Sequence, residues 1–131
     1  MAPRSLTRAE GQAVVELALT LPLILLLLFA ITQVAFSVQR YQVVVHAARE
    51  GARFASVSRA DAHGVADTVS AAKLAASDLS QTQLAVTVTP AQPWAAGQQV
   101  SVTVSYPYSI DIMGVVVTSG RLSSTSTAKM Q

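Results

Sequence analysis

The residues with the clearest chemical meaning are a glycine and a glutamate at the edge of a long apolar run. Gly11 precedes Glu16 by five residues, and the 23 residues from Leu17 to Gln39 carry no charge. A carboxylate at the edge of such a segment is expensive to bury, and a simple anchor does not need one. A glycine behind a short basic leader indicates a proteolytic processing site. Cleavage after Gly11 would create a new amine at Gln12, one helical turn from Glu16.

Other groups capable of chemistry are few, and each has a simpler interpretation. Asp61, His63 and Asp67 can be drawn as a metal site, but no further His or Cys supports it. Ser70 and Lys73 match the S-x-x-K pattern of serine nucleophiles, but the companion S-D-N and K-T-G motifs are absent. We therefore predict no metal, no cofactor and no enzymatic activity, and an anchored hydrolase remains a remote alternative.

The composition limits the remaining classes of protein. The chain has 131 residues with a net charge of +2, is 51% hydrophobic and contains no cysteine. This length accommodates one small domain and one membrane segment. The nine lysines and arginines form no dense cluster, which argues against nucleic-acid binding. Disulfides and thiol chemistry are excluded.

The apolar run has the length of a transmembrane helix. As a helix, Leu17 to Gln39 would extend roughly 34 Å, against about 30 Å for the hydrocarbon core of a bilayer. Pro22 lies inside it and is expected to kink it. A secretory signal peptide would have a shorter apolar region of about 7–15 residues. A plain signal anchor fits the run but does not explain Gly11 and Glu16.

Helical periodicity continues beyond the apolar run to Val57. Ala47, Gly51 and Ala55 recur at four-residue intervals on its apolar face, and small residues at this spacing let two backbones approach closely. Packing against the chain's own domain and packing against another subunit explain this seam equally well. The complete buried face is predicted as Val44, Ala47, Ala48, Gly51 and Ala55, and the polar face as His46, Arg49, Glu50 and Arg53.

The remaining sequence predicts a second helix followed by strands. The helix is expected from about Gly64 to Leu79, and period-two alternation then predicts strands around 84–89, 100–106 and 123–129. The predicted fold class is α+β: a long N-terminal transmembrane and amphipathic helix, a second helix and a small antiparallel sheet of about three strands. The second helix is expected to bury Val65, Val69, Ala72, Ala76 and Leu79.

Two further features concern apolar and aromatic side chains. An apolar patch lies between Pro107 and Gly120, and we expect it to fold back as core, with an exposed contact surface as the alternative. Tyr41 and Trp94 are candidates for anchoring at a lipid interface, although a cap on the small core is the better interpretation of Trp94.

Two segments resemble a known family. The stretch GQAVVELALTLPL from Gly11 to Leu23 looks like the opening of TadE-like proteins, which are pseudopilins of the tight-adherence (Tad/Flp) pilus system. The stretch AAREGARFA, which ends at Ala55, resembles a second signature of that family, and the strand ending at Pro107 and the terminal Ser/Thr strand fit its C-terminal part. Leu17 stands where Tad prepilins typically carry an aromatic residue.

The resemblance implies a pilin-like fold and cleavage after Gly11 by a prepilin peptidase on the cytoplasmic side. It implies a minor pilin or assembly factor of the pilus. In an assembly with a low-dielectric core, the Glu16 carboxylate would neutralise the Gln12 amine of a neighbouring subunit and fix the axial register. The chain then divides into a leader (1–11), a transmembrane helix (12–40) and an extracytoplasmic α+β domain (41–131).

The implied location is the bacterial inner membrane, crossed once. The implied partners are the prepilin peptidase, other pilin or pseudopilin subunits and the pilus assembly platform. Counting the lysines and arginines near the helix ends would place the C-terminal side in the cytoplasm, and the resemblance overrides that count. The alternative function is a membrane-anchored binding module of the envelope that never enters a filament. Processing at Gly11 distinguishes the two.

Overall fold

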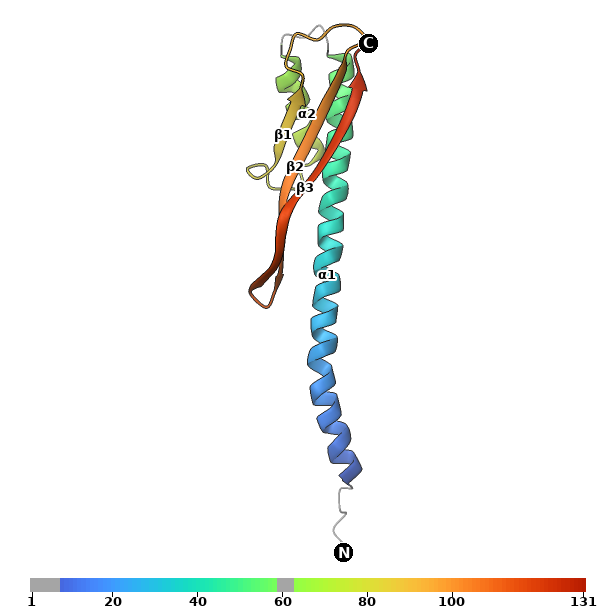
Figure 1. Ribbon diagram of the computed structural model, residues 1–131, viewed down its shortest axis with the longest axis vertical. Coiled ribbons are helices and arrows are strands. Elements are labelled where there is room, and N and C mark those ends of the chain that lie inside the picture. Colours follow the sequence, from blue (N-terminus) through green and yellow to red (C-terminus); the bar gives the residue numbers. More distant parts are fainter. Residues whose placement is uncertain (1–7, 59–62) are drawn as a thin grey trace, which may run out of the picture.

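The described part of the chain folds into two helices and a three-stranded antiparallel sheet. The computed structural model describes residues 8–58 and 63–131. Figure 1 shows α1 as a long rod whose C-terminal half packs against the other elements, while its N-terminal half projects away from them. The predicted α+β fold is confirmed. In chain order the elements are α1 (Arg8–Val57), α2 (Gly64–Ala75), β1 (Ala85–Thr89), β2 (Gln99–Ile112) and β3 (Val115–Lys129).

Helix α1 runs without a break from the apolar run into the domain. It contains 50 residues, which corresponds to roughly 75 Å. Pro22 lies inside it and removes one backbone donor, but the leucine- and alanine-rich flanks have high helix propensity and the helix continues. At its end, the Ser58 hydroxyl donates to the Phe54 carbonyl at 2.9 Å, which satisfies one of the last unpaired carbonyls.

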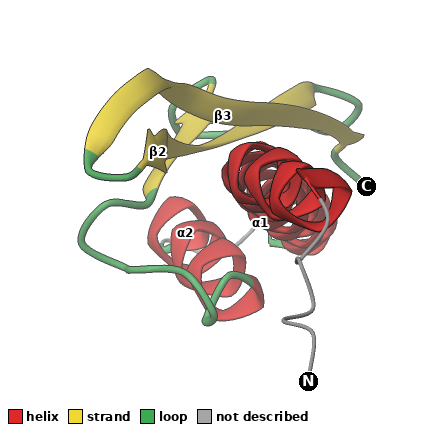
Figure 2. Ribbon diagram, turned by 90° about the horizontal axis from the view of Figure 1, so that it is seen from below, coloured by secondary structure: helices red, strands yellow, loops and turns green. Residues whose placement is uncertain are grey.

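The sheet has the order β1-β2-β3, with both neighbouring pairs antiparallel. Val104 of β2 lies opposite Val86 of β1, and Val102 lies opposite Ser126 of β3. Figure 2 shows both helices on one face of this sheet, so the domain has two layers and the other face of the sheet is open. The open face is polar, and the hydroxyls of Thr103 and Thr125 form a cross-strand hydrogen bond of 2.8 Å there.

The hydrophobic core lies between α1, α2 and β2. Small side chains on α1 face valines on β2, so the helix lies close to the sheet. The C-terminus closes the core, because the buried Met130 pairs with the backbone of Gln98 and the Gln131 amide donates to the Ser56 carbonyl. The buried apolar residues are Val44, Ala47, Ala48, Ala52, Ala55, Ala72, Ala76, Leu79, Leu84, Trp94, Val100, Val102, Val104, Tyr106 and Met130.

Helix α2 differs from its predicted bounds and its predicted buried face. It ends at Ala75 rather than Leu79, because Gln81 folds back and donates its side-chain amide to the Ala76 carbonyl at 2.9 Å, capping the helix end. The predicted Ala72, Ala76 and Leu79 are buried, but Val65 and Val69 are only half-buried. Thr68, which was not predicted, is fully buried. The small residues of α2 face α1 at close range, and the valines therefore lie at the sides of the contact.

The apolar patch between Pro107 and Gly120 is not core, and that prediction was wrong. Strands β2 and β3 extend through it and form a long hairpin that reaches beyond the core, alongside α1 (Figure 1). At the tip, Met113 is 90% exposed and Val115 is 67% exposed. Beyond the domain the hairpin has α1 on one side and no described element on the other, so its outer residues stay exposed. The alternative of an exposed surface is the correct one.

Candidate membrane and assembly segment

The N-terminal half of α1 presents apolar side chains outward on all sides. The helix from Gly11 to Val57 is long and apolar enough to cross a membrane by length and composition, and the most apolar part of it is unburied. Leu19 and Leu23, for example, are 69% and 68% exposed. Such a surface is unfavourable in water, so this half of the helix requires apolar surroundings.

The hydroxyl groups of the uncharged run are satisfied within the helix itself. Thr20, Thr32 and Ser37 each donate to the backbone carbonyl four residues earlier, at 2.7, 2.8 and 3.1 Å. In hydrocarbon no water is present to accept these hydrogen bonds, so polar groups must be paired internally. The run therefore carries its hydroxyls at little cost in a bilayer.

The residues of the predicted processing and assembly site lie together on consecutive turns of this exposed helix. The side-chain amide of Gln12 donates to the Glu16 carboxylate at 3.4 Å, and Leu17 beside it is 63% exposed. A Cβ added at Gly11 would meet no atom within 4 Å. Glycine inside a helix is roughly 0.5–1 kcal/mol less favourable than alanine. Among the described residues, no contact therefore explains a glycine at position 11.

The second glycine of α1 has the opposite surroundings. A Cβ added at Gly51 would lie 3.0 Å from Cγ1 of Val102 and 3.1 Å from Cβ of Ala72. Ala47 and Ala55, one turn to either side, are fully buried. The structure thus places this seam at the junction of α1, α2 and β2, against the chain's own domain.

Among the described residues, the candidate metal and nucleophile groups form no reactive cluster. Asp61 lies outside the described residues, and His63 is exposed on the surface. Across residues 8–58 and 63–131, no group of three His, Cys, Asp or Glu side chains is placed to hold a metal ion. The Ser70 hydroxyl donates to the Ala66 carbonyl at 2.9 Å, and Ser70 and Lys73 border a shallow hollow on the solvent side of α2.

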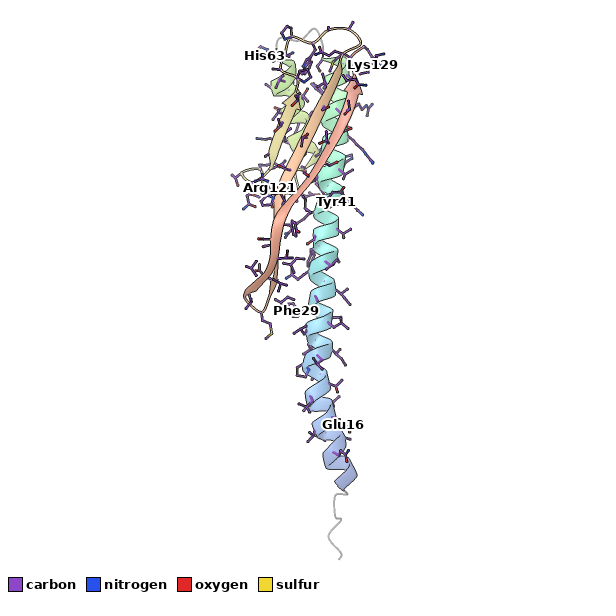
Figure 3. All side chains as sticks on the ribbon, viewed as in Figure 1. Glu16, Phe29, Tyr41, His63, Arg121 and Lys129 are labelled. Atoms are coloured by element: carbon purple, nitrogen blue, oxygen red, sulfur yellow. The ribbon has the colours of Figure 1, made fainter. Side chains whose placement is uncertain are left out.

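The two aromatic candidates for a lipid interface have different positions. Trp94 is 5% exposed, and its indole nitrogen donates to the Pro90 carbonyl at 2.9 Å, so it belongs to the core. Tyr41 is 45% exposed and lies on α1 where the helix enters the domain (Figure 3).

A contact between α1 and the hairpin was missed by the sequence reasoning. The Gln33 side-chain amide donates to the Asp111 carbonyl at 3.2 Å, 78 positions away in the chain. The sequence indicated this contact, because the alternation of apolar and polar residues that begins in the core strand continues through Tyr108, Ile110 and Ile112. That alternation indicates a strand extending past the core. The side chains that line the resulting groove are Val34, Ser37, Val38, Tyr41, Tyr108, Ile110 and Leu122.

These features define a class of protein. A membrane-capable helix that continues unbroken into the core of a small α+β domain fits a pilin-like membrane protein. The model of the family described as TadE-like protein matches residues 11–53, which all lie in α1 and begin at the candidate processing glycine. The match confirms the resemblance to TadE-like proteins of the Tad pilus system. No curated protein and no solved structure matches the chain.

Proposed function

We propose that this protein is a minor pilin (pseudopilin) or assembly factor of a Tad/Flp type IV pilus. In this proposal α1 holds the chain in the bacterial inner membrane and residues 41–131 lie outside the cytoplasm. The TadE-like match over residues 11–53 and the exposed apolar half of α1 support it. The role is structural rather than enzymatic.

The observation that carries the proposal is the pairing of an unexplained glycine with an exposed glutamate. Gly11 meets nothing that would exclude a side chain, so we attribute the glycine to recognition by a prepilin peptidase. Cleavage behind it would turn the backbone nitrogen of Gln12 into an amine. The Glu16 carboxylate lies one turn away on the same exposed helix end.

Glu16 is proposed to act between subunits. Its carboxylate is exposed within the chain, and in a packed assembly of such helices it would be buried beside the Gln12 amine of a neighbour. A buried charge costs far less when it is paired and hydrogen-bonded than when it stands alone. The pair would favour one axial offset between neighbouring helices over the others.

The test is the N-terminal sequence of the mature protein isolated from cells that express the pilus system. A mature chain beginning at Gln12 supports the proposal. A chain that keeps Met1 in the membrane would instead favour a membrane-anchored binding module of the envelope. A chain beginning after Ser37 would indicate a cleaved signal peptide and would contradict both.

A further inference from the structure

The end of the β2–β3 hairpin lies beside the membrane-capable part of α1. The Gln33 amide reaches the Asp111 carbonyl at 3.2 Å, and Figure 3 shows the hairpin tip near the level of Phe29. Arg121, farther up the hairpin, lies near the level of Tyr41 in the same view. The hairpin therefore lies alongside the apolar run over several turns of helix.

This position fixes the depth of the tip whenever α1 spans a bilayer, a premise taken from the proposed function. Phe29 lies ten residues before Gln39, the domain-side end of the uncharged run, which corresponds to roughly 15 Å along the helix. Gln33 is roughly 9 Å from the same end. The hydrocarbon core is about 30 Å thick, so a hairpin end held at these levels lies within it.

The side chains of the hairpin end suit such surroundings. Met113, Val115, Val116 and Val117 are 90%, 67%, 58% and 61% exposed, so the protein itself covers little of them. An apolar cluster of this kind at a projecting tip marks a surface that needs an apolar partner. Contact with acyl chains would remove these four side chains from water.

The backbone connection at the tip is short. Ile112 and Val115 form the last pair of the ladder, and Met113 and Gly114 between them have φ values of 52° and 83°. Positive φ at both central residues is typical of the two-residue type I′ turn, the tightest hairpin connection. The turn itself leaves few backbone groups unpaired, but the ladder shifts register between Ile110 and Asp111 and the outer edges of the projecting hairpin pair with no described strand, so these groups need water or lipid headgroups as partners.

Polar residues mark the boundary above this apolar end. Arg40 and Tyr108 line a common hollow beside the upper part of the hairpin, and Tyr41 and Arg121 lie at a similar height (Figure 3). Tyrosine and arginine are favoured at the headgroup level, where an apolar body and a polar end are both accommodated. Below this boundary, Asp111 is the one charged residue of the hairpin, exposed on the side away from the half-buried Ile110 and Ile112.

We propose that the hairpin tip, residues 112–117, is a second membrane contact that inserts into the domain-side leaflet next to α1. The occupant of its apolar surface is phospholipid acyl chain. The Asp111 carboxylate limits the depth, because the bilayer must thin locally to keep it hydrated. The protein is then held by a spanning helix and by a hairpin that reaches through one leaflet, with the domain lying against the membrane surface.

The absence of cysteine from the chain permits a direct test with single-cysteine variants. Met113→Cys and Val116→Cys in the full-length protein are labelled with an environment-sensitive fluorophore in vesicles of phosphatidylethanolamine and phosphatidylglycerol. Lys129→Cys, exposed at the far end of β3, is the aqueous control, and Leu25→Cys in α1 is the membrane control. Quenching by spin-labelled acyl chains is compared with quenching by aqueous iodide.

We expect labels at Met113 and Val116 to be quenched by the acyl chains and protected from iodide, and the label at Lys129 to show the reverse. If Leu25 is lipid-quenched while Met113 and Val116 are open to iodide, the hairpin proposal is overturned and α1 still spans. Tip labels shielded from both quenchers would also overturn it, because a protein partner then covers the tip. A Leu25 label that lipid does not quench would overturn the spanning premise together with the proposal.

Discussion

Gly51 is the point on α1 where the three elements of the core meet, and Gly51→Leu is expected to destabilise the domain strongly. The Cβ alone would lie 3.0 Å from Val102 and 3.1 Å from Ala72, closer than ordinary van der Waals contact. Neither neighbour yields easily, because Val102 is fully buried and the Cβ of Ala72 is fixed to the backbone of α2. Leucine adds three more carbons at this point.

The magnitude follows from two opposing effects. Overpacking a tight core typically lowers the free energy of unfolding by about 1–3 kcal/mol. We expect leucine in this crowded junction to have a cost near the upper end of that range. Leucine has a helix propensity better than glycine by nearly 1 kcal/mol, which offsets part of the cost. The net loss is then about 2 kcal/mol. For a domain of this size each kcal/mol lowers the melting temperature by roughly 4–8 °C, so we expect a decrease of about 8–16 °C.

The assay is thermal melting of the fragment 41–131, which contains every residue of the buried core. The matched control is Arg53→Leu, which introduces the same side chain two positions later on the exposed face of α1. A change there is expected to stay within about 0.5 kcal/mol. An unchanged melting temperature for Gly51→Leu, combined with lost piliation in cells, would show that the seam faces another subunit. A larger loss for Arg53→Leu would show that the buried face is assigned wrongly.

Three further outcomes are expected. Gly11→Leu should leave the fold intact, because no described atom lies within 4 Å of the added Cβ. Immunoblots should nevertheless show a longer precursor retained in the membrane, and a normally processed chain would count against a peptidase site. The Glu16→Ala variant should insert into the membrane normally, because the change makes the segment more apolar, but less partner pilin should co-purify with it. Undiminished co-purification and normal piliation would show that Glu16 has no assembly role. Thr68→Val should raise the free energy of unfolding of the 41–131 fragment by about 1 kcal/mol, because the buried Thr68 hydroxyl has no hydrogen-bond partner among the described residues. The measurement is a urea titration, and a lowered midpoint would refute this explanation.

Helix α1 and the core strands were predictable because their periodicity is strong and uninterrupted. The buried face of α1 was assigned from the spacing of small residues alone, and Val44, Ala47 and Ala55 are all fully buried. The central strand around 100–106 was equally clear, because valine alternates there with serine and threonine. In these segments local propensity and tertiary packing favour the same structure.

The hairpin end and part of the buried face of the second helix were predicted wrongly, for different physical reasons. An apolar patch is predicted to be core when the surroundings are assumed to be water. The pairing of Ile112 with Val115 beyond the edge of the domain could not be inferred from the sequence. In α2 hydrophobicity favours burial of Val65 and Val69, but the side packed against Gly51 carries Ala72 and Thr68. The Thr68 hydroxyl has no hydrogen-bond partner among the described residues. The roles predicted for Gly11 and Glu16 at the helix start rest on their chemistry and their place in the sequence, and they stay predictions.

The unbroken course of α1 couples the anchor and the domain mechanically. A helix of 50 residues transmits axial displacement and rotation directly, and each inserted residue would move the domain by about 1.5 Å and turn it by about 100°. Kinks in helices arise chiefly at prolines, so Pro22 is the point where bending is concentrated. In the proposed assembly, a bend at Pro22 would change the direction in which the short arm before it presents Glu16 to a neighbouring helix. The long part of α1 after Pro22 moves with the domain as one rigid body. In the proposed arrangement, extraction of α1 from the membrane would therefore extract the hairpin as well.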